Sequence, residues 1–268
     1  MSATQALAAY VDGIGVLGPG LPDWPGSAQV LTGRAPWEFA PTVLPVPQCL
    51  SGAERRRVSA LVKLTLAAGL EATAAAGADA ATLPTVFTSS GGDGANCHEI
   101  CQVLAGDRQL SPTRFHNSVH NAAAGYWGIA SGATAASNAL CAHDASFGAG
   151  LLETLCQVAA ERRSVLLIAY DAGYPEPLRS VRPIPEAFAV ALLLSPAAGE
   201  ASLARIEVSR SEAPPERMPD AQLEALRGAI PAARSLPLLA QLARGGSGRV
   251  ALEYLGARCL AVEVGTCR

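Results

Sequence analysis

The sequence predicts an α/β protein, in which a mixed β-sheet packs against a central helix. Residues 145–160 are nearly free of charge and have the length of a helix, and residues 164–170, just before Asp171, form an apolar run with the length of a strand. A second strand-like run, 85–90, leads into a glycine-rich turn at 91–94 and a further helix at 95–105. Strands that alternate with helices in this way are typical of α/β folds.

The segment 145–160 has apolar or small residues on nearly every face, as a helix buried on all sides would have. At about 16 residues it is too short for a bilayer, which needs roughly 20. The residues just before it lie where a strand feeds a helix N-terminus. In α/β proteins such a turn favours an anion or a nucleophile, because free N–H groups and the helix dipole point there.

The composition suits a globular chain with a large core. Of 268 residues, 50% are hydrophobic and 16% charged, the net charge is −3, and no clustered basic face predicts a nucleic-acid partner. We expect no signal peptide and no membrane span, since the first residues lack basic and apolar regions and no apolar run is long enough. The seven cysteines then read as reduced thiols of a cytoplasmic protein.

The N-terminal third begins with a strand, 10–20, that runs into a glycine turn. Prolines follow where a dinucleotide-binding fingerprint needs a helix, so no cofactor is predicted there. A proline-rich surface loop covers 36–48, and Ser51 begins a long helix over 55–76. The one basic cluster comprises Arg55, Arg56 and Arg57, either as a solvated first turn or as a contact for an acidic carrier or a phosphate.

One metal-like pattern joins Cys97 and Cys101 to His116 and His120, with spacing close to that of a zinc site. The cysteines are one helical turn apart among apolar residues, and the large core needs no metal to hold it. We therefore favour packing over zinc and predict no metal.

The remaining elements follow in order. Residues 133–140 form a small-residue strand, and 187–194 with 203–208 form an expected hairpin. Two short helices, 220–230 and 236–243, precede a terminal apolar strand pair at 250–255 and 259–264. This division predicts a main domain over 1–210 and an appendage over 211–268 that packs on it.

Five motifs stand out along the chain: Gly13–Val16, Pro19–Trp24, His120–Trp127, 145–153 and 165–171. Together they resemble β-ketoacyl synthases of the thiolase superfamily. The resemblance is greatest to the short "β-ketoacyl synthase-like, N-terminal domain" proteins of aryl polyene and xanthomonadin-type pathways. It implies a thiolase-like fold of which only the N-terminal half is present.

The same resemblance puts the family's nucleophilic cysteine at His143, with Asp144 next. The family's two later basic residues are also missing, because no histidine follows His143 and the only lysine is Lys63. We therefore expect no catalytic residue and no condensing activity from the chain alone. The alternative is an acyltransferase or condensing enzyme that uses Cys141 as nucleophile, with His143 and Asp144 nearby.

By the same resemblance, the chain is a subunit of the chain-length-factor type. It would pair with an active ketosynthase and meet an acyl carrier protein indirectly, or form a homodimer when alone. In ketosynthases the strand corresponding to 133–140 pairs with its twin across a two-fold axis, which would cover an exposed edge. The expected interface residues are Asn121, Tyr126, Trp127 and Ser137, and the expected carrier contacts are Arg55, Arg56 and Arg57.

Overall fold

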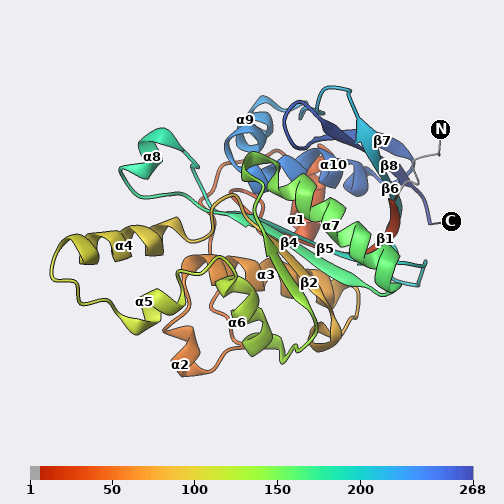
Figure 1. Cartoon of the computed structure of the whole chain (residues 1–268). Coiled ribbons are helices and arrows are strands. Elements are labelled where there is room, and N and C mark those ends of the chain that lie inside the picture. The colour runs from red at the N-terminus through yellow and green to blue at the C-terminus, as the bar shows by residue number, and fades with distance from the viewer. Residues whose placement is uncertain (1–6, 268) are drawn as a thin grey trace.

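A computed structural model describes residues 7–267, in which eight strands form a single mixed sheet with helices on both faces (Figure 1). The spatial order is β3-β2-β4-β5-β1-β6-β8-β7; β2 runs parallel to β3 and β4, and the other neighbouring pairs are antiparallel. The strands are β1 (Leu7–Leu17), β2 (Thr85–Thr88), β3 (Ser137–Leu140), β4 (Val165–Asp171), β5 (Phe188–Ser195), β6 (Ala204–Ser211), β7 (Gly248–Glu253) and β8 (Cys259–Gly265). The predicted α/β class with a mixed sheet is confirmed.

The helices of the described chain follow the same numbering as Figure 1. The α-helices are α1 (Trp24–Leu31), α2 (Gly52–Arg55), α3 (Ala60–Ala75), α4 (Gly94–Ala105), α5 (Pro112–His116), α6 (Ala122–Ser131), α7 (Ser146–Glu161), α8 (Leu178–Val181), α9 (Ala221–Ala229) and α10 (Leu236–Arg244). Three short 3₁₀ helices are η1 (Ala80–Thr82), η2 (His143–Ala145) and η3 (Pro231–Ser235).

Two apolar layers hold the helices to the sheet. On one face, α3 and α6 cover side chains such as Phe87 and Ile168. On the other, α7 and η3 cover alternate residues of the same strands, among them Val86 and Leu167, while α10 covers β7 and β8. The strands β4 and β5 are buried along their whole length, as a central sheet between two helical layers requires.

The central strand β1 corrects one expectation. It pairs antiparallel with β5 on one side and with β6 on the other, so the hairpin expected between 187–194 and 203–208 is wrong. Because β1 is buried over most of its length, both of its edges need a partner strand. It also lies very close to α3: a Cβ on Gly15 would be 2.0 Å from the carbonyl oxygen of Ala68.

The helix expected over 55–76 is interrupted. It comprises α2 and α3, because Ser59 caps a new helix by accepting a hydrogen bond from the N–H of Val62. The central helix α7 has its predicted place, but it is not buried on every side. Its outer face leaves Cys156, Ala159 and Ala160 exposed, since only one face meets the sheet.

Residues 211–268 are expected as an appendage on residues 1–210; in the described part of that segment, 211–267, β7 and β8 extend the same sheet and α9, η3 and α10 join its helical layers. The guanidinium of Arg227, only 5% exposed, lies 2.8 Å from both carboxylate oxygens of Glu253 and also binds Glu224. The hydrogen bond from Arg227 lowers the pKa of Glu224 to about 2. Hydrogen bonds to these two acidic partners offset the free-energy cost of burying the guanidinium.

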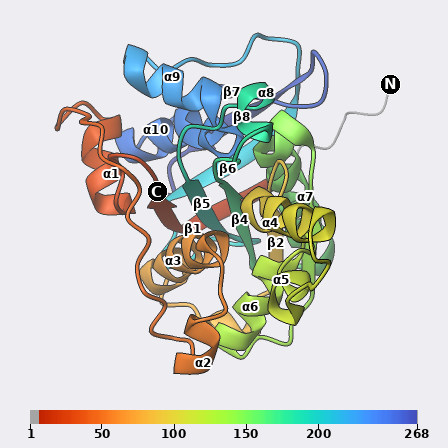
Figure 2. The same ribbon diagram turned by 90° about the vertical axis from the view of Figure 1, so that its left-hand side faces the viewer.

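Three helices, α4, α5 and α8, extend away from the sheet on one side of the molecule (Figures 1 and 2). They leave apolar side chains exposed, including Phe115 and Val181. Among the helices at 7–267, none is long and apolar enough to cross a membrane.

Candidate functional site

The turn between β3 and α7 is where the sequence predicts chemistry, and the structure gives it an unusual backbone. His143 has φ of 51°, in the left-handed region that a non-glycine residue rarely adopts. The buried Ser146 supports this turn, because its hydroxyl donates to the carbonyl of His143 at 2.7 Å and accepts from the N–H of Ala142 at 3.0 Å. The turn therefore presents the side chain of His143 outward, where it is 71% exposed.

The imidazole of His143 is held by an arginine from the loop between β4 and β5. Nη1 of Arg182 lies 2.9 Å from Nε2 of His143. A guanidinium only donates, so Nε2 must accept, and this assigns the ring proton to Nδ1. Nδ1 faces Oδ1 of Asp144 at 3.5 Å. The lone pair that a general base would use is thus already occupied.

Asp144 joins this turn to the C-terminal part of the chain. Its carboxylate accepts from Nη2 of Arg182 at 2.7 Å and lies 3.1 Å from Nη2 of Arg234 in η3. Burial works to raise the pKa of Asp144, but the hydrogen bond from Arg182 and the charges of Arg234, Arg182 and His143 lower it overall. The carboxylate therefore stays ionised between two arginines, as a structural ion cluster does.

Cys141, the alternative nucleophile, has different neighbours. Its side chain is exposed, and its thiol donates to the carbonyl oxygen of Ser90 at 3.2 Å. Within residues 7–267 no hydrogen bond joins it to His143, whose imidazole faces Arg182. The pair that would activate a thiolate is not formed in this arrangement.

A buried carboxylate lies behind the turn. Asp171, 2% exposed at the end of β4, accepts from the N–H and hydroxyl of Ser90 at 2.8 and 2.6 Å, from the hydroxyl of Ser89 at 3.3 Å and from the N–H of Ala232 at 2.9 Å. Burial raises the pKa of Asp171 to about 6, although these hydrogen bonds lower it. Through these hydrogen bonds Asp171 connects the turn after β2 to η3 and so fixes the position of both segments next to the site.

The expected interface residues fall into two groups. Asn121 and Ser137 are exposed, and Ser137 lies on β3, the edge strand of the sheet. Tyr126 and Trp127 are only 2% and 1% exposed and belong to the core between α3, α6 and the sheet, so they cannot contact a partner directly. This corrects the expectation for those two: in α6 the aromatic side chains turn inward, where Trp127 packs edge-on against Phe87.

The arginine cluster before α3 is partly engaged. Arg55 donates to Oε1 of Gln48 at 2.9 Å, and Arg57 pairs with Glu54 at 2.9 Å. The guanidinium of Arg56 forms no hydrogen bond or ion pair with any residue in the described part of the chain, and only its backbone N–H is bonded, to the carbonyl of Glu54. Of the three, Arg56 is the cation left for an external anion.

The metal-like residues do not form a cluster. Cys97 and Cys101 are exposed on α4, not packed in a core as expected, and His116 stacks edge-on against Tyr126. Residues 7–267 hold no group of three or more metal-ligating side chains. The helix α4 extends away from the sheet, which explains why its apolar-looking face stays in solvent.

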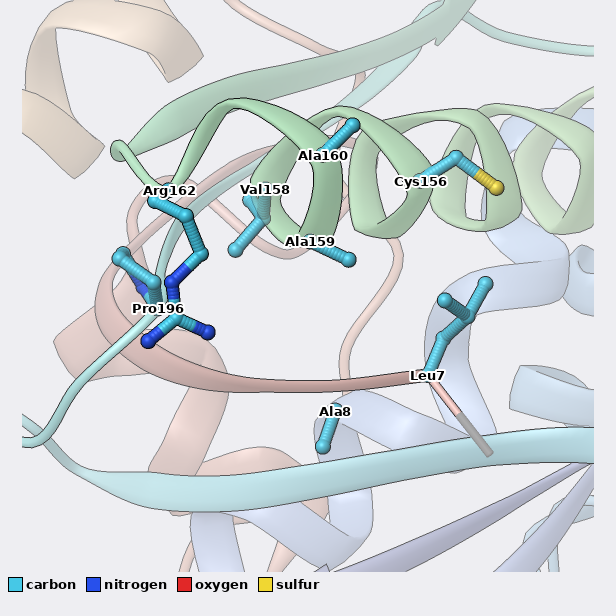
Figure 3. Close-up of a pocket in the computed structure, with 8 residues that line it drawn as sticks. All are labelled: Leu7, Ala8, Cys156, Val158, Ala159, Ala160, Arg162 and Pro196. Carbon is cyan, nitrogen blue, oxygen red and sulfur yellow. The ribbon is translucent and has the colours of Figure 1, made fainter. Parts of the chain in front are cut away.

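A cavity of about 600 Å³ lies beside the C-terminal end of α7, between Cys156, Arg162 and the start of β1 (Figure 3). It lies at the opposite end of α7 from His143, roughly 20 Å away by the helical rise. It therefore takes no part in the turn described above.

Sequence reasoning missed three residues of the site, Arg182, Arg234 and Asp171. Arg182 and Arg234 come from segments far along the chain, and no local pattern marks either as a neighbour of His143. Asp171 did carry a signal, since it directly follows an apolar strand. A carboxylate at the end of a buried strand must find donors when the chain folds.

Comparison with known proteins agrees with this architecture. The chain is similar in structure to the ketosynthase (ApeO) in complex with its chain length factor (ApeC) from Xenorhabdus doucetiae, with 24% identity, a TM-score of 0.73, and 97% of this chain and 99% of that chain covered. It is also similar to the ishigamide ketosynthase/chain length factor (13% identity, TM-score 0.70, 97% and 99% covered). A β-ketoacyl synthase from Burkholderia phymatum STM815 matches at 10% identity and a TM-score of 0.65, with 98% and 100% covered.

At these identities the structural likeness shows a shared fold, and it confirms the expected thiolase-like, ketosynthase-type architecture. No curated protein sequence matches the chain. The family comparison is more specific, because residues 34–245 match the family described as "Beta-ketoacyl synthase, N-terminal domain". That match covers well over half of the 268 residues, and the chain therefore belongs to the β-ketoacyl synthase N-terminal domain family.

Proposed function

We propose that this chain is a non-catalytic, ketosynthase-like subunit of the chain-length-factor type, which pairs with an active β-ketoacyl synthase in chain elongation of the aryl polyene kind. The observation that carries the proposal is the turn before α7. At the position that the resemblance assigns to the family's nucleophilic cysteine, this chain has His143, whose Nε2 accepts a hydrogen bond from Arg182. Neither a thiolate nor a free base is supplied there.

The edge strand β3 supports a paired state. Among the strands of residues 7–267 it pairs only with β2, so its other side presents N–H and C=O groups that bind no other described strand, and both Ser137 and Asn138 are exposed. An uncovered edge of this kind pairs readily with another strand. A similar structure, from Xenorhabdus doucetiae, is described as a ketosynthase in complex with its chain length factor. We propose the same kind of partner here, with Asn121 and Ser137 in the interface, and a homodimer when the partner is missing.

We also propose that Arg55, Arg56 and Arg57 contact the acidic acyl carrier protein that serves the pair. Arg56 would contribute most, because Arg55 and Arg57 are already bound to Gln48 and Glu54. An exposed arginine without a partner is available for steering an acidic protein toward the complex.

The test is co-purification of tagged chain with an untagged ketosynthase encoded beside it. We expect a heterodimer for the parent and for Ser247→Arg, a control that adds the same charge at an exposed site beside β7, the opposite edge of the sheet. Ser137→Arg should abolish it, because it would bury an unpaired cation at the strand pair. Light scattering should show a homodimer of the parent alone.

A stable monomer that captures no ketosynthase would refute the proposal. Equal capture of the ketosynthase by Ser137→Arg and Ser247→Arg would show that the interface does not include β3. If the chain instead carries an acyl group on Cys141 after incubation with an acyl thioester, the acyltransferase alternative would replace the subunit proposal.

A further inference from the structure

A second cavity, of about 400 Å³, lies between the N-terminal ends of α3 and α4 and the short helix α5. These elements meet on the side of the molecule from which α4 and α5 extend (Figure 2). The cavity differs from the one beside α7 in being rich in hydrogen-bond donors. The groups that can donate into it come from Arg56, Arg57, Arg114, Ser59, Ser111 and Thr113.

The walls of this cavity are fixed by two buried asparagines. Nδ2 of Asn117 donates to the carbonyl of Arg57 at 2.8 Å, and Nδ2 of Asn96 donates to the carbonyl of Arg114 at 2.9 Å. The two asparagines are 6% and 8% exposed. They hold α5 to the ends of α3 and α4, so the cavity exists before any ligand arrives, as pre-formed small-molecule sites do.

The side chains that line the cavity carry three positive charges, on Arg56, Arg57 and Arg114, and two negative charges, on Asp93 and Glu99. Arg57 pairs with Glu54, Arg114 pairs with Glu99, and the carboxylate of Asp93 caps α4 by accepting from the N–H of Asn96. Arg56 is the lining cation with no partner among the described residues. It lies beside the N-terminus of α3, a helix of 16 residues whose first N–H groups and dipole also attract an anion.

We propose that this cavity, which we call the α3–α5 cavity, binds a small phosphorylated molecule, with Arg56 as its principal charged contact. Guanidinium groups, hydroxyls and the N–H groups of a helix N-terminus are the donors that phosphate oxygens take. The volume exceeds that of a single phosphate, which leaves room for the group that carries it. Binding in the cavity needs no ketosynthase partner, although Arg56 is also the residue proposed above to contact the acyl carrier protein.

The test is calorimetric titration of the full chain with pyrophosphate at constant ionic strength, with tricarballylate as a carboxylate anion of similar charge. We expect saturable binding of pyrophosphate at one site per chain, weakened about tenfold by Arg56→Ala, which removes a charge-assisted contact. Arg34→Ala is the matched control: the residue is exposed, lies outside the cavity lining, and its guanidinium forms no hydrogen bond or ion pair within residues 7–267. It should bind pyrophosphate as the parent does.

Three results would overturn the proposal: no saturable binding of pyrophosphate, equal weakening by the two arginine variants, or equally tight binding of tricarballylate. Thermal unfolding of both variants checks for a folding defect, and none is expected because the guanidinium of Arg56 forms no hydrogen bond or ion pair within residues 7–267. The ketosynthase capture assay with Ser137→Arg is scored separately, so failure of the cavity and failure of the subunit proposal are distinguishable.

Discussion

Arg182 and His143, 39 residues apart in sequence, meet at 2.9 Å between Nη1 and Nε2, and the same guanidinium binds Asp144 at 2.7 Å. One residue of the loop between β4 and β5 thus closes the turn that precedes α7. The contact fixes the tautomer of the histidine, and the same guanidinium offsets the negative charge of the ionised Asp144 carboxylate. Together with Arg234, Arg182 connects three segments at Asp144: the turn before α7, the loop between β4 and β5, and η3.

The first prediction follows from this contact. Arg182→Ala should make His143 react about tenfold faster with diethyl pyrocarbonate, because the Nε2 lone pair loses a hydrogen bond from a charged donor. Peptide mass spectrometry over time gives the rate at each of the four histidines. Arg179→Ala, a change at an exposed residue of the nearby α8, is the control and should leave the rate unaltered. An unchanged rate in Arg182→Ala would contradict the assignment of Nε2 as acceptor.

The second prediction concerns Cys141. Incubation of the purified chain with an acyl thioester should give no stable adduct on this residue and no condensation product, because its thiol donates to a carbonyl oxygen and has no histidine beside it. Mass spectrometry of the peptide that contains Cys141 is the measurement, and Cys141→Ser provides the blank. A stoichiometric acyl peptide in the parent alone would show that the thiol is a nucleophile after all.

The third prediction concerns the packing of β1 against α3. Gly15→Ala should lower the free energy of unfolding by about 3 kcal/mol, because its Cβ would overlap the backbone of Ala68 and neither element can move freely. Gly125→Ala is the control within α6, where an added Cβ meets nothing within 4 Å. It should raise stability by about 0.5–1 kcal/mol through helix propensity. Urea unfolding measures both, and equal effects would refute the close approach.

The fourth prediction concerns pH. The pKa of Asp171 is raised from 3.8 to about 6, so the folded chain holds this proton more tightly than the unfolded chain does. Its contribution to stability is therefore greatest below about pH 4 and is lost as the pH rises through about 6. The lost amount is about 3 kcal/mol for a shift of this size.

The comparison that isolates this effect is with Asp171→Asn, whose amide does not titrate. The difference in unfolding free energy, parent minus variant, should fall between pH 4 and pH 7, whatever the absolute cost of the substitution. Urea titrations at pH 4, 5, 6 and 7 give this difference. The contributions of the other carboxylates to the unfolding free energy cancel, because parent and variant share them. A difference that rises with pH would mean that the hydrogen bonds from Ser89, Ser90 and Ala232 outweigh burial.

The sequence by itself determined the fold class and most of its elements. The uncharged helix before an apolar strand predicted α7 and β4, and the last two helices and two strands were found where their patterns placed them. These signals are local, because the periodicity of apolar residues is set by the contacts of one helix or strand. The absence of a cysteine at residue 143 was likewise readable from the letters alone.

Only the tertiary structure decided which elements are neighbours. It put β1 between β5 and β6, turned Tyr126 and Trp127 into the core, and left the outer face of α7 exposed. It also brought Arg182 and Arg234 to Asp144. The local sequence around an arginine does not indicate which distant carboxylate it will bind. That pairing depends on how the sheet and its loops close in space, where burial and charge act between residues that the chain keeps apart.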